Sequence, residues 1–144
     1  MKMKTSDKGI GLIKQYEGLK LHAYLCPAKV WTIGYGHTKG VKKGDVITES
    51  RAVDLLKDDL IDAESAVTKQ DLAINQNQFD ALVSFVYNVG SGAFAGSTLL
   101  KKIKKNPNDP LIRTEFAKWN KSKGRVLDGL VKRRKAESDL YFKQ

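Results

Sequence analysis

The chain has 144 residues and a formal net charge of +10, enough for a single domain whose core needs neither a disulfide nor a structural metal. Its one cysteine, Cys26, excludes an intramolecular disulfide. No apolar run approaches the roughly 18 residues of a membrane span, and none resembles a signal peptide, so we expect synthesis in the cytoplasm. The charge favours an anionic partner but does not choose among nucleic acid, lipid and cell wall.

The first predicted helix begins near Ser6 and ends at Gly18. Ile10, Ile13 and Glu17 follow a helical spacing, which places Glu17 on the stripe that faces the core. The negative end of the helix dipole and poor solvation would both favour the protonated carboxyl, which suits Glu17 to proton donation. Alternatively, Glu17 turns outward and is solvated.

Residues 30–37 alternate between two faces, which predicts a strand. One face carries Gly34 and Gly36, so a ligand could lie close to its backbone. Turns at Gly40 and Gly44 predict a return of the chain through a small antiparallel sheet.

A long helix is predicted over residues 49–69, with Thr48 as its N-cap. It has one apolar stripe, and its acidic residues lie opposite. We expect this helix to join two lobes and its acids to be solvated.

The second half of the chain is predicted to be helical. Residues 79–89 are apolar nearly all round, which predicts a buried central helix. Residues 120–128 are rich in Lys and Gly and predict a loop. Arg134 and Glu137 share the apolar face of the last helix, which predicts an inward ion pair. Helix starts are predicted at Asn75 or Asn77, Ser97, Asp109–Pro110 and Gly129.

Four motifs in order resemble the phage-type lysozymes of glycoside hydrolase family 24, the bacteriophage endolysins. They are Tyr16-Glu17-Gly18-Leu19-Lys20-Leu21 with Trp31-Thr32-Ile33-Gly34-Tyr35-Gly36-His37-Thr38, then residues 78–90, Ser97-Thr98-Leu99-Leu100, and residues 129–137. The resemblance covers nearly the whole chain. It implies an α+β, lysozyme-like fold that is mostly helical, with a small antiparallel sheet.

The domain organisation that we expect is one lysozyme-like domain over residues 1–144. Its parts would be an N-terminal lobe over about residues 1–50, a linking helix over about 49–69, and a helical lobe over about 70–144. The resemblance places a carbohydrate cleft between the two lobes.

The resemblance implies that Glu17 is the general acid and that Thr32 helps to position water. The family's second carboxylate is usually an aspartate nine residues after the glutamate, and this chain has Cys26 there. A thiol with an ordinary pKa of about 8.5 is mostly protonated at neutral pH. As a thiolate, Cys26 could serve as base or nucleophile; otherwise it is a bystander, and Glu17 acts alone as in lytic transglycosylases.

The resemblance also indicates supporting residues. The residue that matches the position expected to pair with the catalytic glutamate is Arg134, with Arg133 as the less favoured alternative. We expect His37 to be structural. We expect neither a metal nor a cofactor. The sugar contacts that the resemblance implies are Thr38, Tyr87, Ser97 and Arg113.

The expected function is an endolysin: a muramidase that cleaves the β-1,4 bond between N-acetylmuramic acid and N-acetylglucosamine in peptidoglycan. Further expectations are binding of other anionic wall components, a monomer, and release from the host cytoplasm through a holin-like pore. The alternatives are a lytic transglycosylase and an inactive wall-binding protein. Without a recognisable nucleic-acid module, we expect no nucleic-acid partner.

Overall fold

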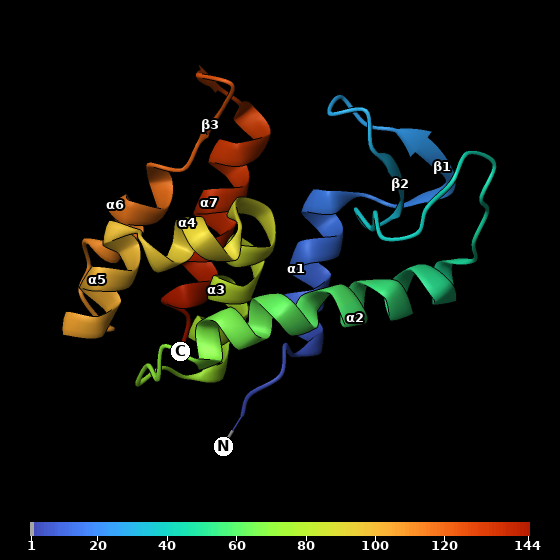
Figure 1. Ribbon diagram of the computed structural model, residues 1–144. Helices are drawn as coiled ribbons and strands as arrows, with labels where there is room; N and C mark the ends of the chain where they lie inside the picture. The colour runs from blue at the N-terminus through green and yellow to red at the C-terminus, as the bar shows by residue number, and fades with distance from the viewer. Residues whose placement is uncertain (1) are drawn as a thin grey trace. The chain divides into compact units, whose positions relative to one another are not determined.

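Helical periodicity dominates the chain, and the computed structural model, which describes residues 2–144, is correspondingly mostly helical (Figure 1). The predicted α+β class with a small antiparallel sheet is confirmed. The elements are α1 (Asp7–Glu17), β1 (Lys20–Leu25), β2 (Trp31–Gly34), α2 (Glu49–Thr68), α3 (Gln76–Val89), α4 (Ser91–Ala95), α5 (Thr98–Lys105), α6 (Ile112–Ala117), β3 (Lys121–Ser122), β4 (Arg125–Val126) and α7 (Asp128–Tyr141).

The chain forms two compact units, which we call the sheet unit and the helical unit. The sheet unit comprises residues 13–61, and the helical unit comprises residues 2–12 together with residues 62–144. The boundaries fall inside α1 and α2, so both helices begin in one unit and end in the other. These limits differ from the expected lobes, because the first residues of the chain group with the helical unit.

The sheet unit is built on the antiparallel hairpin of β1 and β2, with Leu25 opposite Trp31 and Tyr24 opposite Thr32. The strand predicted over residues 30–37 is too long, because β2 ends at Gly34. Gly34 has a φ of +67°, a left-handed conformation that glycine adopts without strain. The chain then turns, and Ile33 and His37 exchange two backbone hydrogen bonds of 2.9 Å.

The glycine face that we expected to be open is covered. Gly34 is buried, and a Cβ placed on it would lie 3.4 Å from the Cβ of Ala52 in α2. Gly34 therefore permits close packing of the turn against α2. The predicted return of the chain is present, since the Ile47 amide donates to the Leu21 carbonyl (2.9 Å) and His22 forms a bridge with Val46.

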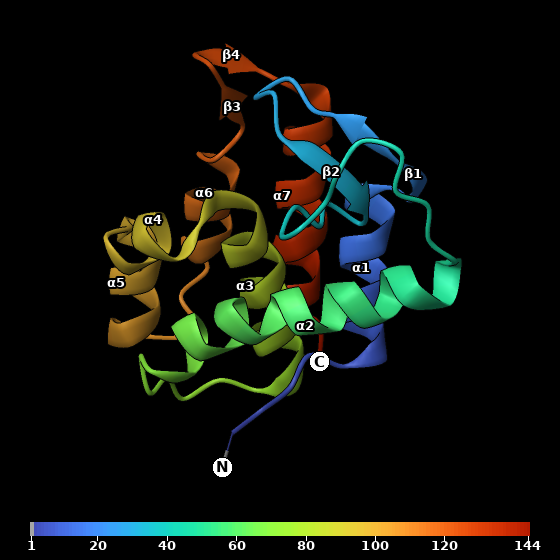
Figure 2. The ribbon, with the colours of Figure 1, turned by 45° about the vertical axis from the view of Figure 1, so that its right-hand side comes forward.

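The helical unit has its core around α3, whose residues are buried without interruption from Gln78 to Val86. Asn75, one of the two caps that the sequence offered, begins the helix with a reciprocal capping box to Gln78. α3 and α7 lie side by side in both ribbon views (Figures 1 and 2). Phe85 packs edge-on against Phe116 and Trp119, each with a ring separation of 5.5 Å.

The segment before α1 is tied to the helical unit by two carboxylates. Glu64 accepts hydrogen bonds of 2.7 Å from the amide and the hydroxyl of Thr5. Asp80 is fully buried and accepts from the amide (3.0 Å) and the hydroxyl of Ser6. Ser6 also caps α1, since its hydroxyl accepts from the Gly9 amide (3.4 Å).

Two predictions for the C-terminal half are wrong in detail. Residues 120–128 contain the hairpin of β3 and β4, and its tight turn places both Lys123 (φ +52°) and Gly124 (φ +79°) in the left-handed region. α6 begins at Ile112 rather than at Pro110, because Asp109 binds the Leu111 amide (2.9 Å) in a turn that precedes the helix. The strands β3 and β4 were missed because two residues are too few to show the alternating pattern by which a strand is recognised.

Among residues 2–144, no helix combines the length and the apolar composition needed to cross a membrane. Over the same residues, no three His, Cys, Asp or Glu side chains gather where they could hold a metal ion.

Candidate active site

Glu17 is the last residue of α1, as its spacing predicts. Gly18 ends the helix with a φ of +74°, and its amide donates to the Lys14 carbonyl (3.0 Å). Ile13 is fully buried and Glu17 half-buried, so the stripe that carries this carboxylate does face inward. The alternative, in which Glu17 turns outward and is solvated, does not agree with this partial burial.

Cys26 lies in the short connection between β1 and β2. Its amide donates to the Val30 carbonyl (3.1 Å), and its carbonyl accepts from the Lys29 amide (2.7 Å). Lys29 has a φ of +63°, a left-handed conformation that turns the backbone back on itself within a few residues. The thiol is half-buried and forms no disulfide.

Thr32 meets Cys26 across this hairpin. Its side chain is buried, with 4% exposed, and its hydroxyl donates to the Val30 carbonyl (3.0 Å). Thr32 stands opposite Tyr24, two residues before Cys26, so strand pairing brings the hydroxyl and the thiol together. A pair six positions apart in sequence thus becomes one polar cluster.

The pKa of the Cys26 thiol is lowered from its ordinary value. The largest cause is a hydrogen bond with the backbone of Val30, and partial burial opposes it. Backbone of Ala28 and the Thr32 hydroxyl lower the pKa further. Hydrogen bonds of this kind stabilise the thiolate, which is the nucleophilic and basic form.

The Thr32 hydroxyl has a single proton to donate, and two acceptors stand near it. Beside the neutral thiol, that proton goes to the Val30 carbonyl, and the hydroxyl can accept from sulfur. A hydroxyl proton directed at sulfur stabilises the thiolate, which is how the Thr32 hydroxyl lowers the pKa of the thiol. The pair can therefore adjust its hydrogen bonding as Cys26 changes protonation.

His37 and Thr38 follow β2 in the sheet unit. His37 Nδ1 lies 2.8 Å from the Asp59 carboxylate in α2, and Nε2 lies 2.8 Å from the Lys39 carbonyl. His37 therefore ties the turn after β2 to α2, and its structural role stays a prediction. Thr38 is exposed and so accessible to a ligand.

The other predicted sugar contacts lie in the helical unit. Tyr87 is half-buried near the end of α3. Ser97 is buried, accepts from the Leu100 amide (3.0 Å) and donates to the Phe94 carbonyl (2.7 Å), so its capping role is clear. Arg113 is half exposed and binds Asp139.

Arg134 is buried, with 1% of its surface exposed. Its Nε lies 3.0 Å from Glu137, and another guanidinium nitrogen donates to Asn88 (2.8 Å). The inward ion pair predicted for α7 is therefore present. Pairing of Arg134 with Glu17 stays a prediction.

Asp59 is the supporting residue that the sequence did not reveal. We expected the acids of α2 to be solvated, yet Asp59 holds His37 and Glu64 holds Thr5. The apolar stripe marked the buried face of α2 correctly, but residues at its border are not distinguished by periodicity. His37, the partner of Asp59, lies 22 positions away in the sequence, so no local pattern connects the two residues.

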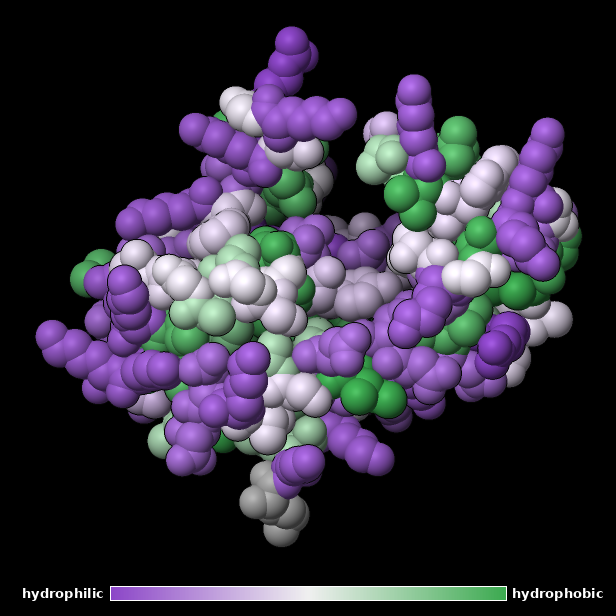
Figure 3. Space-filling model, viewed as in Figure 1, coloured by the Kyte–Doolittle hydropathy of each residue, from purple (hydrophilic) through white to green (hydrophobic). Residues whose placement is uncertain are grey.

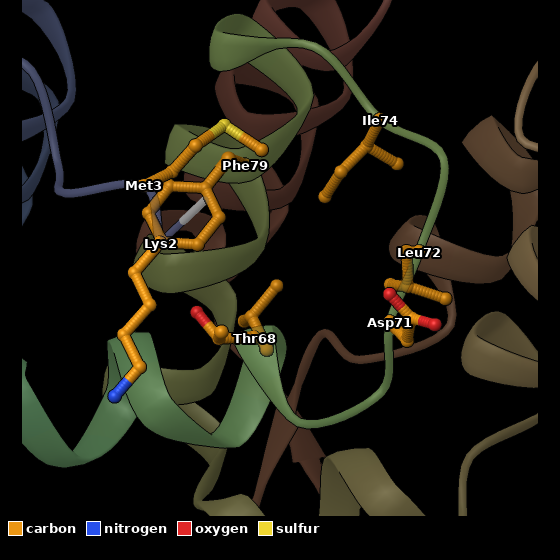
Figure 4. A pocket seen from close by; sticks show the side chains of 8 residues that line it. Lys2, Met3, Thr68, Asp71, Leu72, Ile74 and Phe79 are labelled. Carbon is orange, nitrogen blue, oxygen red and sulfur yellow. The ribbon is translucent and has the colours of Figure 1, made fainter.

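Two of the pockets formed by the described residues open on the helical unit. The first, of about 190 Å³, has Met3 and Phe79 on one side and Leu72, Ile74 and Asp71 on the other (Figure 4). The second, of about 380 Å³, is lined by Asn88, Val89, Trp119, Lys121, Ser122, Leu127 and Leu130. None of the predicted site residues lines either pocket.

Comparisons with known proteins agree with the motifs. The family model of phage lysozymes matches residues 14–137. An endolysin of Acyrthosiphon pisum secondary endosymbiont phage 1 is 45% identical over 144 residues, covering 96% of this chain and 98% of that protein. An endolysin of Bacillus phage PZA is 47% identical, but its match covers 96% of this chain and only 55% of that protein, so this chain spans about half its length.

A solved structure extends the agreement to the fold. The muramidase domain of SpmX from Asticaccaulis excentricus is 35% identical, with a TM-score of 0.91 over 98% of this chain and 99% of that one. With a family match over most of the sequence, a relative matched almost end to end and a closely superimposable fold, the chain belongs to the phage lysozyme family.

Proposed function

We propose that this protein is a muramidase that hydrolyses the β-1,4 bond between N-acetylmuramic acid and N-acetylglucosamine, and that it acts in host-cell lysis. Family membership supports glycoside hydrolysis of peptidoglycan. The observation that carries the more specific proposal is the Cys26–Thr32 pair with its lowered thiol pKa. It supplies a basic group where a usual family member has a carboxylate.

In the proposed reaction, Glu17 donates its proton to the glycosidic oxygen as the bond from that oxygen to the anomeric carbon breaks. The Cys26 thiolate accepts a proton from a water molecule that Thr32 helps to hold. The oxygen of this water bonds to the anomeric carbon. Glu17 is left as a carboxylate and Cys26 as a thiol, and one proton transferred through solvent restores both.

A nucleophilic role for Cys26 is the other route to the same products. The thiolate would attack the anomeric carbon, and water would then release the sugar from sulfur. Both routes need the thiolate, which the backbone of Val30 and the Thr32 hydroxyl favour.

Mass spectrometry of the soluble fragments released from purified peptidoglycan tests the proposed reaction. Hydrolysis leaves a reducing muramic acid, whereas a lytic transglycosylase leaves a 1,6-anhydro ring. Anhydro products would overturn the role of water and of Cys26. Wall binding without fragments would favour the inactive binding protein.

Variants separate the residue roles. We expect Glu17→Gln to abolish turnover, Cys26→Ser to leave little activity, and Cys26→Asp to retain much of it, because a carboxylate restores a base. Thr32→Val is the matched control for the hydroxyl, since it keeps the branched side chain. Full activity of Cys26→Ser would remove Cys26 from the mechanism.

The pH dependence of thiol alkylation tests the environment of Cys26 directly. Thiolate reacts with iodoacetamide and thiol does not, so the midpoint of the rate against pH should lie below that of a free cysteine measured alongside. In Thr32→Val the midpoint should move upward, because one of the hydrogen bonds to sulfur is lost. An unchanged midpoint would contradict the contact between the two side chains.

We further propose that the protein acts as a monomer on peptidoglycan, binds other anionic wall components, and reaches the wall from the cytoplasm through a holin-like pore. The net charge of +10 supports attraction to an anionic wall. Lysis of cells from outside by the purified protein, compared with lysis from within with and without a pore-forming protein, tests the route.

A further inference from the structure

The positive charge of the chain is concentrated in one stretch of the helical unit. Residues 91–127 contain nine lysines and arginines but only two acids, Asp109 and Glu115. Both acids are engaged: Asp109 accepts from the Leu111 amide (2.9 Å), and Glu115 binds Lys118 (2.9 Å). Little negative charge is therefore left to neutralise this stretch.

Four of these cations lie on α5, and we call them the α5 lysine face: Lys101, Lys102, Lys104 and Lys105. Lys101, Lys104 and Lys105 are exposed, and their spacing puts them on one side of the helix within about 6 Å along its axis. Figure 3 shows hydrophilic side chains projecting from the surface over this helix.

Several other cations of the same unit have acidic partners, whereas in the described part of the chain the lysines of this face have none. Arg113 and Lys135 bind Asp139, and Lys118 binds Glu115. Across residues 2–144, the structure records no ion pair for any of the four lysines of α5. The helix dipole favours cations in the last turn, but it does not account for Lys101 or require a cluster.

The opposite side of α5 is already occupied by the core. Leu99, Leu100 and Ile103 are at most 2% exposed, so this helix has no apolar side chain with which to enter a lipid layer. It has no aromatic ring on which a nucleobase could stack. A lysine behaves as a hydrated point charge, and as a point charge it binds phosphate groups without requiring a fixed geometry.

We propose that the α5 lysine face is an accessory docking surface for a phosphodiester polymer attached to peptidoglycan. It would hold the protein on the wall while the active site works, and it would contribute binding rather than chemistry. This inference rests on the proposed function for the location of its partner, but it does not depend on the catalytic roles of Glu17 or Cys26.

Binding to isolated walls tests the proposal. Lys101→Gln/Lys104→Gln/Lys105→Gln removes three charges from the face. Lys8→Gln/Lys69→Gln/Lys143→Gln removes three exposed charges elsewhere and is the matched control. Each is measured by co-sedimentation in the full-length Glu17→Gln protein, with walls that carry the phosphate polymer and with walls from which it has been extracted.

We expect the α5 variant to bind polymer-bearing walls at least about fivefold more weakly, and the control to lose much less. The slope of log affinity against log salt should fall by about two in the α5 variant, as for loss of three contacts to a single-stranded polyanion. With extracted walls the two variants should bind alike. In an otherwise unchanged protein, fragment release from extracted peptidoglycan should be equal in both.

Three outcomes would overturn the proposal. Equal losses in the two variants would mean that only net charge matters. If the unaltered protein binds equally well before and after the polymer is extracted from the walls, the phosphate polymer is not its partner. Soluble poly(glycerol phosphate) and a DNA oligonucleotide of equal charge can each compete for binding to the α5 lysine face. If the DNA competes more effectively, the face binds nucleic acid instead. Failure of the proposed hydrolysis would instead appear as absent fragments with wall binding intact.

Discussion

Two carboxylates on α7 have similar partners but opposite environments. Glu137 lies between Arg133 (3.2 Å) and Arg134 (3.0 Å) and is fully buried. Asp139 lies between Arg113 (2.5 Å) and Lys135 (2.9 Å), and its side chain is 48% exposed. The two clusters stand two residues apart on opposite sides of one helix.

Their pKa values move in opposite directions. Burial raises the pKa of the Glu137 carboxyl, and the guanidiniums of Arg134 and Arg133 oppose that rise. Hydrogen bonds from Lys135 and Arg113 lower the pKa of Asp139, with little desolvation against them. Solvent exposure, rather than the number of cations, therefore decides what each cluster contributes to folding.

The largest effect is expected from Glu137→Ala. It leaves two buried guanidiniums without their carboxylate, which should lower the free energy of unfolding by about 3–5 kcal/mol. Urea unfolding followed by circular dichroism measures the change. Asp139→Ala is the matched control on the same helix, and equal losses in the two variants would refute the role of burial.

Ser84→Ala should have an intermediate effect. The Ser84 hydroxyl donates to Glu137 (2.5 Å) inside the core, and loss of a hydrogen bond to a buried charge costs about 1.5–3 kcal/mol. Ser65→Ala, at an exposed position on α2, is the control and should change stability little. Identical unfolding midpoints for these two variants would show that Glu137 does not need the hydroxyl.

Asp139→Asn should cost less than about 1 kcal/mol at low salt, because exposed ion pairs are solvated and screened. Raising the salt concentration should remove most of that difference but leave the effect of Glu137→Ala in place. Thermal unfolding of both variants at low and high salt provides the measurement. If the loss of stability in Asp139→Asn does not depend on salt, the Asp139 cluster behaves like the buried Glu137 cluster, and the prediction is wrong.

The smallest effect concerns pH. Because folding lowers the pKa of Asp139, its stabilisation is present above its ordinary value of 3.8 and is lost as pH falls through the lower pKa of the folded state. The difference in stability between the unaltered protein and Asp139→Asn should therefore fade as the pH falls below 3.8. A difference that grows on acidification would contradict the direction of this shift.

Much of the helical architecture could be read from short-range patterns. Thr48, Asn75 and Ser97 begin helices as predicted, because a capping side chain acts on amides within three residues. The buried run of α3 and the end of α1 at Gly18 follow equally local rules. The β3–β4 hairpin escaped prediction because its two-residue strands have too little sequence to show a period.

In the candidate site, too, the sequence predicted some features and only the structure showed others. Motifs indicated Glu17, Cys26 and Thr32 one by one, but the chemical relation of Cys26 to Thr32 depends on strand pairing. The glycine face of the predicted strand was misjudged, since Gly34 serves close packing against Ala52. Spacing alone does not tell an open face from a covered one.

The sequence by itself determined the family, the helix caps, the apolar stripes and the excess of positive charge, because each depends on residue identity over a few neighbouring positions. Only the tertiary structure decided that Asp59 holds His37, that Asp80 holds Ser6, and that Glu137 is buried while Asp139 is not. These partners are far apart along the chain, or differ only in which side of a helix is covered. Their energetic roles are set by dielectric environment and proximity, which only folding creates.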